Sequence, residues 1–315
     1  MNTAPRPADT APDAVDAQVD RLLRDLPPDR PVLIAGPTAS GKSALAARIV
    51  REGGGLIVNA DALQVYGNWR LLTARPSAGE EAALPHRLYG HVAAGDSYSV
   101  GHWLREVAEI LEGPNAPRPV VVGGTGLYFR ALTEGLAPIP ATPADLRAEL
   151  DARLREEGVA ALAAELVRED PATAGGIDLA NPKRVQRALE VLRATGRGLR
   201  TWQDATPAPL LPIDRVLPIV LSPGRDALNA RIDLRFDQMM DQGALEEARA
   251  NLPGWDPAAL SSRAIGAPEL IAHLQGEIDL ATAVARAKIA THQYAKRQRT
   301  WFRARMGNWH PVVPF

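Results

Sequence analysis

One stretch of the sequence decides the fold: Pro31-Val32-Leu33-Ile34-Ala35, then Gly36-Pro37-Thr38-Ala39-Ser40-Gly41-Lys42-Ser43, then Ala44 to Arg51. The first part is a continuous apolar run, typical of a strand buried on both faces of a parallel sheet. The second part satisfies the pattern G-x-x-x-x-G-K-[ST], and the third has the composition of a helix. A strand, a glycine-rich loop and a helix in this order predict a phosphate-binding loop.

The residue types in this loop suit the binding of phosphate. Its glycines let the backbone approach phosphate oxygens closely, so that successive N–H groups and the helix N-terminus face the anion. Lys42 adds a positive charge, and the hydroxyl of Ser43 is a candidate Mg²⁺ ligand. The loop itself fits triphosphate, diphosphate and pyrophosphate. The candidate phosphate-binding residues are Gly36, Pro37, Thr38, Ala39, Ser40, Gly41, Lys42 and Ser43.

Three further short runs are rich in β-formers and alternate with segments of helical length. They are Leu56 to Asn59, Pro119 to Val122 and Val216 to Leu221, and Val100 to Leu111 follows Ser99 as a capped helix. Strands alternating with helices predict an α/β fold, with a three-layer, P-loop NTPase-like domain and a mostly parallel sheet.

The middle of the chain interrupts this alternation. Residues 138–198 contain no β-rich run, and Pro143 to Glu169 and Pro182 to Ala194 are predicted to be helices. We therefore expect an α/β core from residues 31–137 and 199–315, a helical insertion domain at residues 138–198, and a flexible N-terminal tail at residues 1–30, in which Ala14 to Leu26 fits a short helix.

Charge is distributed unevenly along the chain. The 315 residues carry a formal net charge of −1, but Leu280 to Phe315 carries +7 and Lys183 to Arg200 carries +5, so the remainder carries −13. Segregated basic segments in an acidic background indicate a polyanionic partner. Each segment alone would also fit a solvated helix face.

Composition excludes several classes of protein. The chain has no cysteine, which removes disulfides, thiolate metal sites and a cysteine nucleophile. No run approaches the ~20 apolar residues of a membrane span, and the acidic N-terminal segment lacks the apolar core of a secretory signal. We expect a soluble cytoplasmic protein without membrane partners, and a monomer.

Two polar positions are expected beside the phosphate loop, because ligands of open parallel sheets bind beyond the carboxyl ends of the strands. Asp61 follows the second strand, and it fits either a Mg²⁺ ligand of the Walker B type or a general base. Thr125 lies in Gly123-Gly124-Thr125-Gly126 after the strand that starts at Pro119. That segment fits either a tight turn or a ligand contact.

Taken together, these motifs resemble the tRNA dimethylallyltransferases of bacterial type, also called tRNA isopentenyltransferases. The resemblance extends from Pro31 to about Pro314. Besides the loop, it rests on Asp61-Ala62-Leu63-Gln64-Val65-Tyr66, Thr73-Ala74-Arg75-Pro76, His86-Arg87-Leu88, Tyr98-Ser99-Val100, Gly123 to Tyr128, Asn181 to Glu190 and Gln293 to Arg303.

The resemblance implies a reaction and roles for its residues. It implies transfer of the dimethylallyl group from dimethylallyl diphosphate to N6 of adenosine 37, in the anticodon stem-loop of tRNAs reading codons that begin with U. The loop would hold the donor's diphosphate and hydrolyse no ATP. Asp61 matches the general base, Ser43 the hydroxyl near Mg²⁺ and Thr125 a residue near the reacting centre. Arg231 matches an arginine near the diphosphate, and Arg235 is close enough to stay an alternative.

The resemblance also implies tRNA contacts, in part through the helical insertion. The implied residues are Asp61, Ala62, Leu63, Gln64, Lys183, Arg184, Val185, Gln186, Arg187, Arg263, Lys296, Arg297, Arg299 and Arg303. Gln64 fits either a residue that holds the flipped base or fills its place in the stack, or a polar turn residue.

The chain departs from the family pattern at four positions. Ala62 stands where serine is common, Arg75 replaces a usual lysine, Ala267 a usual tyrosine and His292 a usual arginine. His292, Lys296, Arg299 and Arg303 recur on one helical face, whereas Val284, Ala287, Tyr294 and Trp301 form a second stripe that we interpret as core.

Three other functions share parts of the pattern. A small-molecule kinase would use the loop and Asp61 but leave the basic helix without a role. A prenyltransferase acting on free adenine nucleotides would leave both basic segments without a role. A non-enzymatic, RNA-binding regulatory protein would use Asp61 only as a metal ligand.

Overall fold

The computed structural model describes residues 12–24, 26–113 and 116–315, and it confirms the predicted parallel sheet. Within these residues the sheet has six strands in the order β3-β2-β4-β1-β5-β6, and each neighbouring pair is parallel. Four strands lie where the sequence predicts them: β1 (Val32–Ala35), β2 (Leu56–Asn59), β4 (Pro119–Gly123) and β5 (Leu217–Leu221). The sequence analysis missed the two edge strands, β3 (His86–Arg87) and β6 (His310–Val312).

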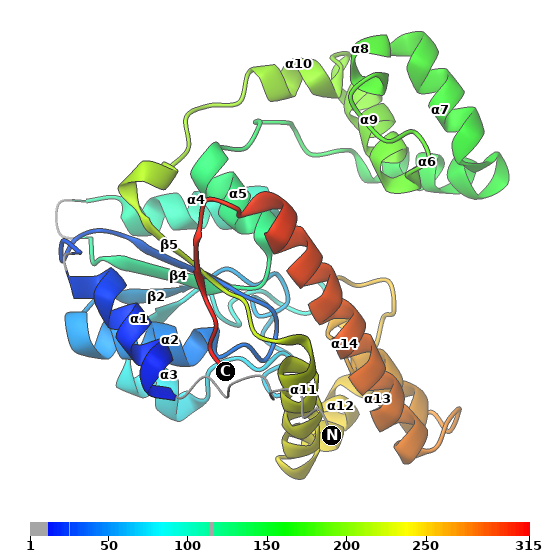
Figure 1. Ribbon diagram of the computed structural model, residues 1–315. Helices are drawn as coiled ribbons and strands as arrows, with labels where there is room; N and C mark the ends of the chain where they lie inside the picture. Colours follow the sequence, from blue (N-terminus) through cyan, green and yellow to red (C-terminus); the bar gives the residue numbers. More distant parts are fainter. Residues whose placement is uncertain (1–11, 25, 114–115) are drawn as a thin grey trace, which may run out of the picture. The chain divides into compact units, whose positions relative to one another are not determined.

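Helices cover both faces of this sheet (Figure 1). On one face, α2 (Lys42–Gly53) packs Ile49 and Val50 against Val32 and Ile34 of β1. On the other face, α4 (Val100–Leu111), α5 (Gly126–Glu134) and the end of α14 (Leu280–Arg305) pack against Leu33 and its neighbours. The four long strands are buried along their whole length because neither face meets water.

The N-terminal segment contains a helix close to the stretch whose sequence fits one. Helix α1 (Pro12–Arg24) lies within the residues that we expected to be flexible, and its Val19 is 1% exposed in the apolar cluster around α2. Burial of an apolar side chain favours an ordered helix from this point of the chain. Residues 1–11 lie outside the described residues.

A group of helices extends the core beyond the sheet. It comprises α11 (Arg225–Asp241), α12 (Ala244–Asn251), α13 (Ala267–Leu274) and the first half of α14. Small residues such as Ala244, Ala248 and Ala287 let these helices pack around Trp69 and Phe236. The short helix α3 (Ala78–Ala83) begins at a capping box of Ser77 and Glu80. The described residues also contain three 3₁₀ turns, Ile213–Arg215 before β5, and Leu252–Gly254 and Ser261–Arg263 between α12 and α13.

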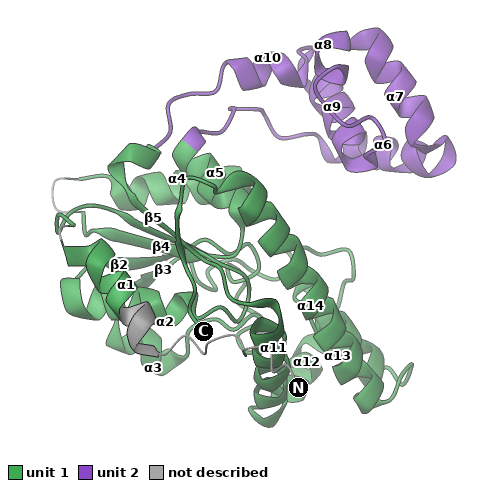
Figure 2. Ribbon diagram, viewed as in Figure 1, with its two compact units in different colours: residues 1–133, 211–315 green, residues 134–210 purple. Residues whose placement is uncertain are grey.

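The chain divides into two units, residues 1–133 with 211–315 and residues 134–210 (Figure 2). The second unit consists of α6 (Ala144–Glu156), α7 (Gly158–Glu169), α8 (Pro171–Ala174), α9 (Pro182–Thr195) and α10 (Leu199–Asp204). Its own core contains Leu150, Leu162, Leu166 and Leu189. The single helix predicted for Pro143 to Glu169 is two helices, because Gly158 takes a φ of 79° and breaks the helical path.

Each unit holds its side of the junction with short contacts. In the first unit, the backbone N–H of Leu211 donates to the carbonyl of Leu132 at 3.0 Å. In the second unit, a Cβ on Gly135 would lie 2.4 Å from the carbonyl oxygen of Pro207. The backbone at the start of this unit therefore runs close to the backbone near its end. The chain therefore leaves for the insertion and returns from it at nearly the same place.

Candidate active site

The phosphate loop connects the end of β1 to the start of α2. Gly41 adopts a left-handed φ of 89°, which favours glycine, immediately before the helix begins at Lys42. A Cβ on Gly36 would lie 2.7 Å from Oγ of the buried Ser40, so a side chain at Gly36 would displace the loop. The strand, loop and helix thus occur as the motif predicts, with the helix N-terminus at the loop.

Lys42 and Ser43 stand at the first turn of α2. The Lys42 ammonium donates to the carbonyl of Pro37 at 3.3 Å, within the loop itself. Burial lowers the pKa of Lys42 to about 8, and the nearby Asp61 carboxylate partly offsets this effect. Ser43 is exposed at the helix start and faces the cavity described below.

Asp61 follows β2 in a tightly bonded turn. The backbone N–H of Asp61 donates to Oδ1 of Asn59 at 2.8 Å, and the Asn59 amide donates to the carbonyls of Asp61 and Leu88, each at 2.9 Å. One carboxylate oxygen of Asp61, Oδ1, accepts from the backbone N–H of Leu63 at 3.0 Å. The other, Oδ2, lies 3.2 Å from the point where Gly124 would carry a Cβ. The turn therefore fixes the carboxylate against the end of β4.

The turn after β4 packs directly on the segment that contains Asp61. The hydroxyl of Thr125 accepts from the backbone N–H of Ala62 at 2.9 Å, and the Thr125 N–H donates to the carbonyl of Ala60 at 3.1 Å. A Cβ on Gly123 would lie 2.0 Å from that same carbonyl oxygen. The glycine is thus required by close backbone approach, and Thr125 supports the Asp61 turn.

These elements line a polar cavity of about 500 Å³. Both Arg231 and Arg235 reach it from successive turns of α11, so the structure brings both candidate arginines to the phosphate loop. Burial, and next the positive charge of Arg231, lower the pKa of Arg235. The guanidinium of Arg231 lies 4.2 Å from the ring centroid of Phe315. The cavity is lined by residues 38–44 with Asp61, Gln64, Thr73, Arg231, Leu234, Arg235 and Gln238.

A smaller, apolar cavity of about 60 Å³ adjoins the polar one. The two share Thr38, Ala39, Asp61, Thr73 and Arg235 in their walls. Leu63, which was expected only as a tRNA contact, lines this cavity. Five further apolar residues of its wall were not predicted, because they come from three separate segments of the chain. These residues are Leu72, Ile232, Phe236, Met239 and Ile265. Asp61 therefore stands where an anion-binding space meets a space suited to a small alkyl group.

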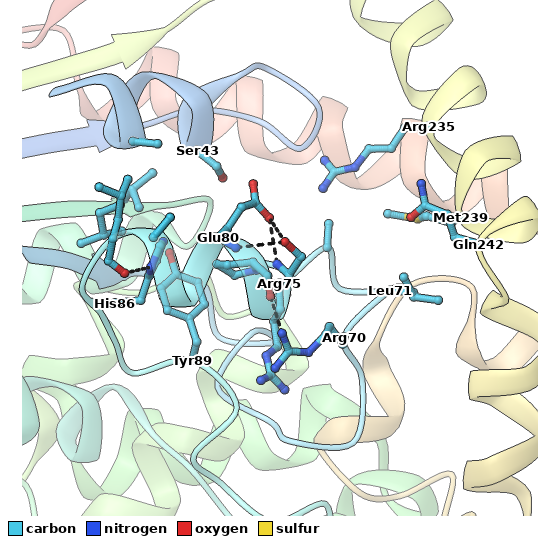
Figure 3. A pocket seen from close by; sticks show the side chains of 18 of the residues that line it. Ser43, Arg70, Leu71, Arg75, Glu80, His86, Tyr89, Arg235, Met239 and Gln242 are labelled. Atoms are coloured by element: carbon cyan, nitrogen blue, oxygen red, sulfur yellow. Dashed lines mark hydrogen bonds between the residues drawn. The ribbon is translucent and has the colours of Figure 1, made fainter. Parts of the chain in front are cut away.

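A third cavity, of about 510 Å³, shares Ser43, Arg235 and Gln238 with the polar one. Figure 3 shows this cavity. Ser43 from α2 and Arg235 from α11 point into it from different elements. Arg75, which replaces the usual lysine, lines this cavity and donates from Nη1 to the carbonyls of Tyr66 and Gly67, each at 3.1 Å. The guanidinium of Arg75 thus holds its own segment against residues 66 and 67.

Gln64 is engaged within the protein. Its Nε2 donates to the carbonyls of Thr73 and Ala74 at 2.8 and 2.9 Å, and it lines the polar cavity. The same segment is held from the other side by Glu247, whose carboxylate accepts the backbone N–H groups of Arg70, Leu71 and Leu72 at 2.6 to 3.0 Å. Glu247 was not predicted from the sequence, because a glutamate on an amphipathic helix usually faces solvent.

The candidate RNA-binding residues of the first unit lie mostly at the surface. On α14, Lys296, Arg297 and Arg303 are exposed and Arg299 is partly exposed, and Arg263 is exposed on its 3₁₀ turn. Nε2 of His292 lies 2.9 Å from the carboxylate of Asp233. The histidine that stands in place of the usual arginine therefore contacts α11. Ala62 and Leu63 are half-buried.

In the second unit the predicted residues divide into two groups. Lys183 and Arg184 are exposed, and Arg187 is half-buried with its guanidinium donating to Oγ1 of Thr142 at 2.7 Å. Val185, by contrast, is 0% exposed in the core, and the buried amide of Gln186 donates to Asp151 at 2.9 Å. These two side chains support the helix that presents the basic ones.

Comparison with known proteins agrees with this geometry. The family model described as IPP transferase matches residues 64–305. The chain belongs to the IPP transferase family. A tRNA dimethylallyltransferase of Cereibacter sphaeroides is 65% identical over 308 residues, which cover 97% of this chain and 96% of that protein.

Solved structures of this IPP transferase family share the fold. The tRNA isopentenylpyrophosphate transferase of Bacillus halodurans is 32% identical with a TM-score of 0.63, over 91% of this chain and 90% of that one. A eukaryotic dimethylallyltransferase described as acting on tRNA is 25% identical with a TM-score of 0.77, over 90% of this chain and 73% of that one. Among the described residues, every helix is too short or too polar to span a membrane.

Proposed function

We propose that this protein transfers the dimethylallyl group of dimethylallyl diphosphate to N6 of adenosine 37 in tRNAs that read codons beginning with U. The observation that carries the proposal is the junction of a phosphate-loop cavity with a small apolar cavity at Asp61. The diphosphate of the donor would bind in the polar cavity and its alkyl group in the apolar one. The Asp61 carboxylate would then lie beside the carbon–oxygen bond that joins them. The apolar space is small enough to suit a short alkyl group and not a nucleoside, and family membership also favours prenyl transfer.

The donor would be bound mainly by charge. We propose that residues 36–43 hold the diphosphate, with Lys42, Arg231 and Arg235 compensating its negative charge. Arg231 and Arg235 act together in this proposal, because both line the cavity. As the bond from C1 of the dimethylallyl group to the diphosphate oxygen breaks, the charge on the leaving group grows and these contacts strengthen.

The acceptor needs help of a different kind. The lone pair of the adenine amine is delocalised into the ring, so N6 becomes a good nucleophile only as it loses a proton. We propose that Oδ2 of Asp61 takes that proton while the N6–C1 bond forms, an effect typically worth about 10² to 10⁴-fold. Thr125 holds the Asp61 turn, and the base would be flipped out of the anticodon loop to reach it.

Magnesium fits the residues present. The described residues contain no cluster of three or more His, Cys, Asp or Glu that could bind a metal. Mg²⁺ commonly takes one or two protein ligands and completes its shell with substrate phosphates and water, which suits the exposed Ser43 hydroxyl. Bound there, Mg²⁺ would supply charge compensation for the leaving diphosphate.

The RNA would bind through its backbone and the anticodon loop. We propose phosphate contacts from Lys296, Arg297, Arg299 and Arg303 on α14, from Arg263, and from Lys183, Arg184 and Arg187 on α9. All residues used here come from one copy of the chain, so we propose a monomer, and we infer a cytoplasmic location from its tRNA substrate.

A single reaction tests the proposal. The protein is incubated with unmodified tRNA, dimethylallyl diphosphate and Mg²⁺, and digested nucleosides are analysed by mass spectrometry for N6-isopentenyladenosine at position 37. Free AMP and an adenosine-37-to-guanosine tRNA serve as matched acceptors that should stay unmodified. Product on AMP alone, or ATP turnover without prenyl transfer, would refute the proposal.

A further inference from the structure

The long helix α14 buries one polar side chain among apolar ones. Its buried residues are Ala283, Ala287, Ala295, Gln298 and Phe302, and Gln298 is 6% exposed. An amide is costly to bury unless its donor and acceptor are both satisfied. Gln298 is therefore held in this position by specific partners.

Those partners are the two loops that form the floor of the site. Oε1 of Gln298 accepts from the backbone N–H of Thr38 at 2.9 Å, and Nε2 donates to the carbonyl of Gly124 at 3.0 Å. Thr38 belongs to the phosphate loop after β1, and Gly124 to the turn after β4, the neighbouring strand. One side chain thus joins the loops of two adjacent strands.

The same contact lies beside the candidate base. A Cβ on Gly124 would stand 2.2 Å from Nε2 of Gln298 and 3.2 Å from Oδ2 of Asp61, so both side chains face this glycine. One turn further along α14, the ring of Trp301 would lie 2.2 Å from a Cβ on Gly126. Helix α14 therefore packs so closely on Gly124 and Gly126 that neither position has room for a side chain.

We propose that Gln298 is a positioning residue for prenyl transfer, which fixes the phosphate loop and the Asp61 turn relative to each other from the helix that carries the RNA-binding lysine and arginines. This role rests on the function proposed above. Because Gln298 accepts the hydrogen bond of the Thr38 N–H, this amide is not available to the diphosphate. The remaining N–H groups of the phosphate loop would bind it. The neighbouring Arg297 is exposed and Arg299 is partly exposed, whereas Gln298 is buried, so its hydrogen bonds lie beneath the surface proposed to bind RNA.

The test replaces Gln298 by methionine, which has similar length but makes neither bond. Gln293→Met, an exposed position of the same helix, is the matched control. For Gln298→Met we expect about tenfold weaker binding of inorganic diphosphate by calorimetry without tRNA, since two backbone groups lose their partner. We expect a higher KM for dimethylallyl diphosphate and a lower kcat, with tRNA affinity within about twofold of the native value and Gln293→Met unchanged throughout.

A second variant reaches the same bond from its other end. Gly124→Ala would press on the Gln298 amide, whereas Gly95→Ala, with nothing near its Cβ, is its control. We expect Gly124→Ala to repeat the selective loss of diphosphate binding. Unchanged diphosphate affinity and kcat in folded variants, or an equal loss of tRNA affinity, would overturn the role of Gln298. A native protein that does not bind diphosphate would overturn the proposed function itself.

Discussion

The hydroxyl of Thr125 accepts a hydrogen bond from the backbone N–H of Ala62, 2.9 Å away, and so connects the end of β4 to the residue after Asp61. Thr125→Val keeps the shape of the side chain but removes this acceptor. We expect kcat to fall about 10 to 100-fold, because small misplacements of a reacting group are costly. Thr125→Ser, which retains the hydroxyl, should keep most of the activity in the same single-turnover assay. Equal activity of the valine and serine variants would contradict this role.

Asp61 should be essential for chemistry and dispensable for RNA binding. Asp61→Asn preserves an acceptor for the N–H of Leu63 but cannot accept the proton from N6. We expect prenyl transfer to fall by about 10² to 10⁴-fold while the Kd for tRNA, measured by filter binding, stays within about twofold. A large loss of tRNA affinity would instead assign Asp61 to the RNA interface.

Donor binding should depend on pH through Lys42. Burial lowers the pKa of Lys42 from 10.5 to about 8, so in the free protein its ammonium loses its proton as the pH rises through 8. Because the charged form binds the diphosphate, we expect affinity to decrease above pH 8, with proton uptake on binding in that range. The unfolded chain holds this proton up to about pH 10.5, so the same group makes folding relatively more favourable as pH rises from 8 to 10.5.

Calorimetry between pH 7 and 10 in buffers of different ionisation enthalpy would measure both the affinity and the proton uptake. Lys42→Arg keeps its charge over this range and serves as the control for ionisation of the ligand. An identical pH dependence in the native protein and in Lys42→Arg would exclude Lys42 as its source.

Glu247 should stabilise residues 70–72, which line the third cavity and the small apolar one. Its carboxylate accepts three backbone N–H groups, and Leu72 among those donors is buried. We expect Glu247→Ala to lower the free energy of unfolding by about 1 to 3 kcal/mol in urea titrations and to speed hydrogen exchange of residues 70–72. Glu246→Ala, an exposed neighbour, should change both by much less. Native exchange rates at residues 70–72 in Glu247→Ala would refute the assignment.

The exposed charges of α14 should set the salt dependence of tRNA binding. Replacing Lys296 and Arg303 by glutamine should weaken binding and reduce the slope of log K against log salt by about 0.7 to 0.9 for each lost phosphate contact. Arg249→Gln removes an exposed charge from α12 and controls for net charge. An unchanged slope in the α14 variants would place the RNA elsewhere.

The parts of the fold predicted from the sequence are those with local signals. The phosphate loop is continuous in sequence, and β1, β2, β4 and β5 are apolar throughout because they are buried on both faces. The edge strands β3 and β6 have two and three residues and are bonded on one side only, so their composition carries little signal.

The parts of the site that were missed depend on contacts between distant segments. Gln298 lies in a strongly basic stretch, and only its spacing of three from Ala295 and four from Phe302 places it on the buried stripe. Val185 lies four residues before the buried Leu189 on α9, and the same periodicity would have separated it from its exposed neighbours. The resemblance implies roles for these stretches as a whole, and it does not distinguish their exposed side chains from their buried ones.

The hydrogen bond between Leu211 and Leu132 bears on how the length of the inserted segment affects the sheet. Because the two ends of the insertion meet at one point, closing it adds little strain or entropy cost to the sheet, whatever the length of the inserted segment. Changes in the length of residues 134–210 are therefore compatible with an unchanged register of the sheet. The same junction offers protein engineers a place at which to insert a different helical module.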